Sequence, residues 1–164
     1  MTGSVDQMDS LEIAHFKEVL GRFVTGVVVV AGSAPEGPVG FTCQTFGSLS
    51  LEPMLVSFAA TSTGTSWSKV RACRTIGLSI LASNQEALAR VFAQSGADKF
   101  AGVDWTPGPG GAPLLYGALA HLEGRIVDVT THGDHDIVVV AVEYAHNHLG
   151  EPLVYYRGGF GLQP

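Results

Sequence analysis

The chain has 164 residues, of which 46% are hydrophobic and 15% are charged, and its net charge is −6. This length and this hydrophobic content predict one domain with one substantial core. Lys and Arg are few and scattered along the chain, which argues against a surface that neutralises a row of nucleic-acid phosphates.

The N-terminus gives no secretion signal, because no basic start is followed by an apolar stretch. The longest apolar run, residues 27–31, is too short to span a bilayer. Cys43 and Cys73 lie far apart without CxxC spacing, which fits a reducing compartment. We therefore expect a cytoplasmic protein without a membrane segment, in which residues 1–10 form a tail and residues 11–164 form one domain.

The first predicted element is a helix over residues 9–22. Asp9 or Ser10 is available as its cap, and apolar residues including Ile13 and Phe16 recur at nearly helical spacing. We expect this helix to lie against a sheet. A β-branched run over residues 24–32 then predicts a strand, and the turn residues 33–38 join it to a second strand in a hairpin.

The second strand of this hairpin is unusually rich in hydroxyl and amide side chains. Apolar and small or polar residues alternate over 39–44, and Thr45, Ser48 and Ser50 follow. Such an array suits the edge of a flat heteroaromatic ligand, and Gly40 would let that ligand approach the backbone. The same residues also fit the satisfaction of turn backbone where a strand ends. The pattern alone leaves both interpretations open.

Residues 54–59 predict a further strand, and the small polar residues 60–66 lead from it into a short helix over 67–72. Because N–H groups in the first turn of a helix lack internal partners, this junction is a candidate anion site. A strand over 75–82 follows. The sequence 83–86 then predicts a capping box for a helix with a buried stripe of Ala87, Leu88, Val91 and Phe92.

Residues 96–117 are rich in Gly and Pro and predict a surface loop. Two long strands are predicted over 118–130 and 136–145, and a last strand over 153–156. Strands outnumber helices without a regular βαβ alternation, which favours a closed or nearly closed antiparallel barrel with a few covering helices over a doubly wound sheet. The hydrophobic pattern alone also leaves a β-sandwich open.

Several chemistries have no support in the sequence. No GxGxxG motif occurs, so neither a Rossmann site nor a P-loop is predicted, and a nicotinamide would have to bind on top of another cofactor. His132 with His135, and His146 with His148, lack a cysteine partner, and we predict no metal site. His135 stands in a Gly-Asp-His-Asp turn, where it is either a nicotinamide contact or an ordinary turn residue.

Four segments that occur in the same order carry a family resemblance. They are Leu20-Gly-Arg-Phe-Val-Thr-Gly-Val-Val-Val-Val, Phe41-Thr-Cys-Gln-Thr-Phe followed by Ser-Leu-Ser-Leu-Glu-Pro, Asp98-Lys-Phe-Ala-Gly-Val-Asp-Trp, and Gly133-Asp-His-Asp with the later Val154-Tyr-Tyr-Arg-Gly. Together they resemble the short-chain flavin reductases, which are the reductase components of two-component flavin-dependent monooxygenases. A colinear set over about residues 11–161 is far more specific than any single motif.

The resemblance implies an FMN-binding split β-barrel of Greek-key type and a homodimer. It also implies an NAD(P)H:flavin oxidoreductase that uses FMN or FAD, takes hydride from NADH or NADPH, and supplies reduced flavin to a partner monooxygenase. His135 would be the catalytic residue, and His135, Tyr156 and Arg157 would face the nicotinamide. Flavin contacts would fall on Val39, Gly40, Phe41, Thr42, Cys43, Gln44, Thr45, Phe58, Ala59, Ala60, Thr61, Ser62, Thr65, Ser66, Phe92, Lys99 and Phe100.

One departure from the family pattern concerns the cofactor phosphate. Where the resembling reductases usually have two basic or bulky residues, this chain has Thr61-Ser-Thr-Gly-Thr. This uncharged stretch implies a looser hold on the phosphate and a flavin that exchanges as a substrate. The alternatives are a self-contained flavoprotein oxidase or monooxygenase, and a non-catalytic flavin-binding redox module.

Overall fold

The computed structural model describes residues 11–96 and 98–162, and strands dominate this part of the chain. The helices are α1 (Ile13–Leu20), α2 (Thr65–Arg71) and α3 (Glu86–Phe92). The strands are β1 (Thr25–Gly26), β2 (Val28–Ala34), β3 (Gly37–Cys43), β4 (Gly47–Leu51), β5 (Met54–Thr61), β6 (Ile76–Ile80), β7 (Trp105–Pro107), β8 (Pro113–Leu115), β9 (Ala120–His132), β10 (His135–Asn147), β11 (Val154–Tyr156) and β12 (Gly159–Phe160).

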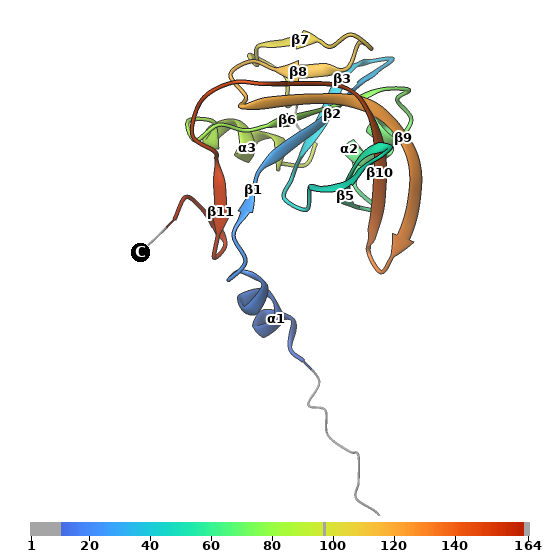
Figure 1. Ribbon diagram of the computed structural model, residues 1–164. Coiled ribbons are helices and arrows are strands. Elements are labelled where there is room, and N and C mark those ends of the chain that lie inside the picture. The colour runs from blue at the N-terminus through green and yellow to red at the C-terminus, as the bar shows by residue number, and fades with distance from the viewer. Residues whose placement is uncertain (1–10, 97, 163–164) are drawn as a thin grey trace, which may run out of the picture.

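Seven strands form one curved antiparallel sheet in the order β3-β2-β6-β9-β10-β5-β4 (Figure 1). The two ends of this order are consecutive in the chain, so the sheet curls back on itself. Thr45, in the connection between β3 and β4, donates its hydroxyl to the carbonyl of Ala59 at 3.0 Å and accepts the N–H of Ala59 at 2.8 Å. The predicted antiparallel barrel is confirmed, and the β-sandwich is excluded.

Strand β2 is buried on both faces and separates two hydrophobic cores. Val28 and Val30 point into the barrel, where they join Phe58 and other apolar side chains of the first core. Val29, like its neighbours at alternate positions, points the other way into a second core that includes Phe92 of α3. Because side chains alternate along a strand, a continuous run of valine serves both cores.

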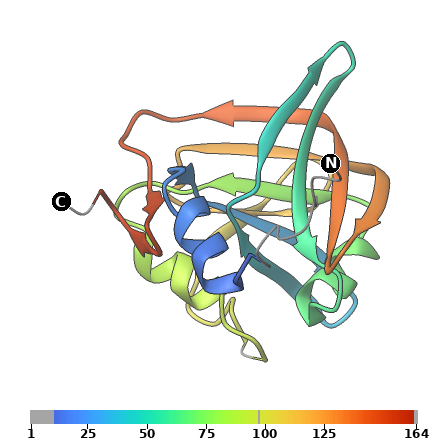
Figure 2. The same cartoon turned by 90° about the horizontal axis from the view of Figure 1, so that it is seen from below.

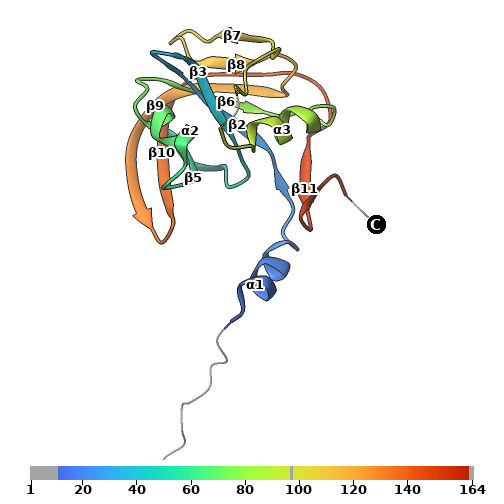
Figure 3. The ribbon, with the colours of Figure 1, turned by 180° about the vertical axis from the view of Figure 1, so that it is seen from behind.

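Helix α1 does not lie against a sheet of its own chain, and this expectation was wrong. None of its residues is buried, and Ile13 and Phe16 keep 73% and 47% of their surface exposed. Figures 1 and 3 show the helix standing away from the barrel. The expected caps, Asp9 and Ser10, lie outside the described residues. The apolar stripe that predicted the helix is therefore not covered by any of the residues that the structure describes.

Helix α3 begins later than its expected capping box. Its N-cap is Gln85, without a side-chain capping bond, and Ser83 instead donates its N–H to the carbonyl of Glu151. The buried positions are Ala89 and Phe92, whereas the expected Ala87 and Val91 are exposed and Leu88 is half-buried. The later start shifts the face that meets the core.

The predicted loop over residues 96–117 contains the short β7–β8 hairpin. The buried Glu123 of β9 accepts the N–H groups of Gly110 and Ala112 and thereby holds this hairpin on the barrel. The hydroxyl-rich stretch is divided between β3 and β4, and β12 was not predicted. No helix within the described ranges is long and apolar enough to cross a membrane.

Candidate functional site

Two adjoining cavities of about 230 Å³ and 370 Å³ lie between β3, α2 and α3, and we call them together the α2–α3 cleft. Ser66 and Lys99 line both cavities. The smaller is also lined by Phe41, Thr42, Ala60, Thr61, Gly64, Thr65, Trp67, Phe92, Ala93, Gln94 and Ser95. The larger is also lined by Glu36, Gly37, Pro38, Val39, Gly40, Lys69, Asp98 and Phe100.

Lys99 supplies a buried ammonium group at the junction of the two cavities. Its residue is only 8% exposed, and Nζ donates to the carbonyls of Gly40 and Phe92, both at 3.1 Å, and to Oγ of Ser66 at 3.0 Å. None of the ion pairs found among the described residues includes Lys99. Burial lowers the pKa of this lysine. The cleft therefore holds a desolvated positive charge that no carboxylate in this part of the chain pairs with directly.

The elements around Lys99 explain why its side chain can be buried. Phe92 is the last residue of α3, and its carbonyl is one of those that a helix end leaves without an internal partner. Gly40 lies on β3 at the edge of the main sheet, and Ser66 lies in the first turn of α2. One ammonium group thus joins three elements that form the walls of the cleft.

Gly40 is also needed for packing, in addition to the ligand approach that the sequence predicts. A Cβ there would lie 2.8 Å from the carbonyl oxygen of Val30 and 3.2 Å from a ring carbon of Phe92. The neighbouring Thr42 donates its hydroxyl to the carbonyl of Ala89 at 2.6 Å. Both residues dock α3 on β3 and set the width of the cleft.

Aromatic rings form the barrel side of the cleft. Phe41 makes a tilted contact with Phe58 and an edge contact with Trp67, and the ring centroids are 6.2 and 6.3 Å apart. Phe92 and Phe100 form a second edge contact at 4.9 Å on the α3 side. A planar ligand would therefore meet apolar rings on two sides and hydroxyl groups between them.

The Gly-Asp-His turn lies beside the polar loop that follows β5. Gly133 has φ of 62°, which a two-residue hairpin loop requires at its first position. His135 is opposite Thr61 in the pairing of β10 with β5, and Ser62 donates both its N–H and its hydroxyl to the carbonyl of Asp134. The imidazole is partly exposed, and its Nδ1 lies 2.7 Å from Oδ1 of Asp134. This bond lowers the pKa of Asp134.

Most of the predicted flavin residues gather at the cleft, but some do not. Cys43 and Phe58 point into the barrel core, and burial raises the pKa of the Cys43 thiol. Gln44 and Thr45 line a separate cavity of about 480 Å³ next to β1. The side chains of Ala59 and Ser62 line none of these spaces. The remaining predicted residues line the cleft: Val39, Gly40, Phe41, Thr42, Ala60, Thr61, Thr65, Ser66, Phe92, Lys99 and Phe100.

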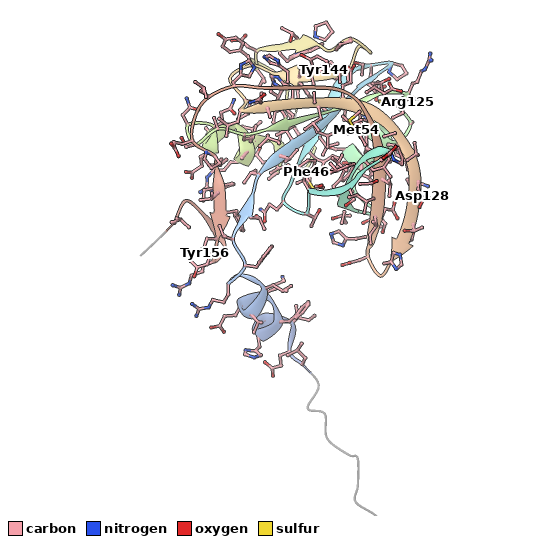
Figure 4. The ribbon with its side chains drawn as sticks, viewed as in Figure 1. Phe46, Met54, Arg125, Asp128, Tyr144 and Tyr156 are labelled. Carbon is pink, nitrogen blue, oxygen red and sulfur yellow. The ribbon has the colours of Figure 1, made fainter. Side chains whose placement is uncertain are left out.

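The predicted nicotinamide residues fall into two groups. Tyr156 ends β11, which pairs with β1 near α1, and Arg157 follows it. The turn between β9 and β10, after which His135 begins β10, lies on the opposite side of the barrel from β11 and Tyr156, as Figures 1 and 4 show. One chain therefore does not bring His135 and Arg157 together.

Sequence reasoning missed part of the cleft. Trp67 was placed at the start of a helix without a role, although its ring forms part of the wall. Gln94 and Ser95 enter the lining because α3 ends just before them, which no local motif indicated. Glu36 and Lys69 pair across the larger cavity at 2.8 Å. A contact between a turn and a helix that are distant in sequence leaves no periodic signal.

A larger cavity, of about 700 Å³, lies elsewhere, between the β7–β8 hairpin and the end of β10. It is lined by His121, His146 and His148, whose rings make edge contacts. It has no Lys or Arg in its lining to match a phosphate. No group of three His, Cys, Asp or Glu residues in the described ranges could hold a metal ion. Its size alone does not make it the site.

Comparisons with known proteins identify a family and several relatives. The chain matches the family described as "Flavin reductase like domain" over residues 20–162. It is 38% identical to the reductase subunit HsaB of a flavin-dependent monooxygenase from Rhodococcus jostii, over 95% of this chain and 81% of that protein. It is 34% identical to the FMN reductase (NADH) SmoA of Agrobacterium fabrum, over 89% of this chain and 83% of that protein.

A solved structure is similar over nearly the whole length. The NADH:FAD oxidoreductase SgcE6 of Streptomyces globisporus, determined with NAD and FAD fragments, superposes with a TM-score of 0.86 at 34% identity, covering 99% of this chain and 98% of that one. This similarity extends from the barrel to the elements that form the cleft.

Proposed function

Because the chain belongs to the flavin reductase like domain family, it is a flavin reductase, and we propose that its reaction takes place at the α2–α3 cleft. The observation that carries this assignment is the buried, unpaired ammonium of Lys99 between the two cavities. A flavin phosphate would supply the missing negative charge. Most of the predicted flavin residues line the same cleft.

The residues present fit a flavin nucleotide. Thr61, Thr65 and Ser66 line the smaller cavity together with Lys99 and supply hydroxyl donors for a phosphate, and the rings of Phe41 and Trp67 form the apolar wall. Lys99 is the buried cation of this wall. Binding would therefore rest on one buried cation, neutral donors and ring contacts, which suits a flavin that exchanges as a substrate.

The chemistry requires little acid or base from the protein. When bound, a flavin would supply the acceptor for the hydride that the nicotinamide donates. The chain's part is to hold the two rings in contact and to stabilise negative charge on the reduced flavin. His135 acts on the nicotinamide side instead: with Nδ1–H donated to Asp134, Nε2 of a neutral ring is an acceptor, which suits the carboxamide N–H of the nicotinamide. Thr61 lies directly opposite and links this turn to the cleft.

Replacing His135 by Ala tests its assignment to the nicotinamide. We expect the apparent KM for NADH to rise about tenfold, with a much smaller change for flavin, because the imidazole would touch only the donor. Steady-state NADH oxidation with added FMN measures both constants. Replacing the neighbouring exposed His132 by Ala is the matched control. Equal effects of the His135 variant on both constants would contradict the assignment.

The partner is inferred to be a flavin-dependent monooxygenase component that receives the reduced flavin. Relatives with this role include HsaB and a reductase component of a 4-nitrophenol 4-monooxygenase from Rhodococcus opacus. We also propose that the protein acts as a homodimer in the cytoplasm. The exposed apolar face of α1 supports a second copy, as does the separation of His135 from Arg157 within one chain.

NADH and NADPH consumption with added FMN, FAD or riboflavin tests the function directly. Steady turnover that scales with free flavin is the expected result. Turnover that requires an organic substrate and a retained flavin would favour a self-contained oxidase or monooxygenase. A yellow protein without turnover of either nicotinamide would favour a non-catalytic redox module. Either of the last two outcomes would overturn the reductase assignment.

A further inference from the structure

Asp136 ends the Gly133-Asp-His-Asp motif but has no assigned role in the reductase chemistry, and it is a buried carboxylate beside both parts of the site. It is 2% exposed. Its Oδ2 accepts the indole N–H of Trp67 at 2.8 Å and lies 3.3 Å from Nη1 of Arg71, and its Oδ1 accepts the hydroxyl of Thr131 at 2.7 Å. The hydrogen bonds from Trp67 and Thr131 lower the pKa of Asp136. A carboxylate bonded from two directions holds one orientation.

These bonds connect two elements that are far apart in sequence. Trp67 and Arg71 belong to α2, and the Trp67 ring lines the smaller cavity of the cleft. Asp136 follows His135 at the start of β10, and Thr131 lies on β9 across the same turn. Because neighbouring side chains of a strand point to opposite faces, anchoring Asp136 inward directs His135 outward.

Building on the proposed function, we propose that Asp136 is a positioning residue that fixes the flavin wall and the nicotinamide turn in one arrangement. Asp136 touches neither ligand itself. Through Trp67 it sets the barrel wall of the cleft, and through the backbone of β10 it sets the position of His135. Binding of the flavin and binding of the nicotinamide therefore depend on the same bond.

Variants on both sides of the bond test this role. Asp136→Leu keeps the branched shape but removes every acceptor, and Trp67→Phe keeps a ring but removes the N–H donor. Asp136→Asn retains the bonds, because its amide oxygen can face Trp67 while its N–H group donates to the hydroxyl of Thr131. Asp128→Asn, on the exposed face of the same hairpin, is the matched control.

Asp136→Leu and Trp67→Phe should each raise the apparent KM for both FMN and NADH about fivefold to tenfold, while kcat changes less than about twofold. Asp136→Asn and Asp128→Asn should stay within about twofold of wild type for both constants. Tryptophan emission of Asp136→Leu should shift, since the indole N–H loses its acceptor. If Asp136→Leu does not fold, Trp67→Phe with its ring intact decides the question.

A rise in only one of the two constants, or unchanged constants in a folded Trp67→Phe protein, would overturn the inference. FMN binding measured by fluorescence titration, without turnover, separates this failure from failure of the proposed function. A wild-type protein that oxidises no nicotinamide would overturn the proposed function. A wild-type protein with normal turnover and an unaffected Trp67→Phe variant would overturn only the role of Asp136.

Discussion

At the residue scale, Lys99 supplies the unpaired positive charge of the cleft. The protein neutralises the neighbouring Lys69 with the carboxylate of Glu36, but it leaves Lys99 with only neutral acceptors. Burying an unpaired cation is unfavourable unless something else compensates it. The loop over residues 61–65 carries no basic residue. The charge of Lys99 is therefore available to bind an anionic ligand in its place.

The variant Lys99→Met should distinguish flavins with a phosphate from the flavin without one. We expect the dissociation constant for FMN to rise about tenfold while that for riboflavin stays nearly unchanged, because only FMN carries the phosphate. Fluorescence titration measures both constants. Lys69→Met, which removes an exposed ammonium already paired with Glu36, is the control. A parallel loss of FMN and riboflavin affinity would place the phosphate elsewhere.

The lowered pKa of Lys99 gives FMN binding a pH dependence. Burial moves this pKa below 10.5, so between the lowered value and 10.5 the unfolded chain binds more protons than the apo protein. The free energy of unfolding contributed by Lys99 therefore rises as pH rises through this window. A phosphate favours the charged form, so FMN affinity should fall over the same window. Riboflavin titrations, and the Lys99→Met protein, should show no such fall.

At the scale of elements, the hairpin of β11 and β12 contains a strained residue. Its two-residue turn consists of Arg157 with φ of 52° and Gly158 with φ of 79°. Both values are positive, as a type I′ turn requires, and Arg is a poor residue for such a position. The presence of an arginine at this strained position supports a binding role for its side chain.

Replacing Arg157 by Asn should therefore separate stability from binding. Asn tolerates the left-handed conformation, so the free energy of unfolding should rise by about 1 kcal/mol. The apparent KM for NADH should rise as well, because the guanidinium is lost. Thermal unfolding and steady-state kinetics measure the two effects. A more stable protein with an unchanged KM would remove Arg157 from the nicotinamide site.

Elements with long, regular patterns were the ones that the sequence predicted well. The strands now observed as β9 and β10 carry alternation over many residues, and the barrel follows from their number and order. The role of Ser83 as a cap was wrong, because Glu151, distant in sequence, takes its N–H. Lys99 was predicted through its motif, whereas a role for Asp136 was missed. The bonds of Asp136 to Trp67 and Arg71 depend on a helix that packs across the barrel.

At the scale of the whole molecule, two apolar surfaces project from the body. One is α1, and the other is the tip of the β4–β5 hairpin, where Leu51 is 86% exposed and Met54 is 62% exposed. Figure 2 shows this hairpin in teal extending beyond the barrel. Exposed apolar groups of this size on projecting elements are typical of surfaces that a partner covers, which supports the proposed homodimer.

Replacing Phe16 by Glu should weaken that dimer, because a charge would enter the apolar face of α1. We expect the molar mass from light scattering to fall toward that of one chain, with a loss of NADH turnover if two copies share the nicotinamide site. Lys17→Glu changes charge on the same helix outside the apolar stripe and is the control. A wild-type protein that is already monomeric would contradict the dimer.

The division of the molecule by β2 has a consequence for how a ligand leaves. The cleft takes one wall from the barrel core, through Trp67, and the other from the second core, through Phe92 and Phe100. Lys99 joins the two walls, because its ammonium group bonds to the carbonyls of Gly40 and Phe92. A ligand bound in the cleft would contact both hydrophobic cores, which share β2, and would help to hold them together. Dissociation of the flavin would then break contacts with both cores but none of the hydrogen bonds that close the barrel.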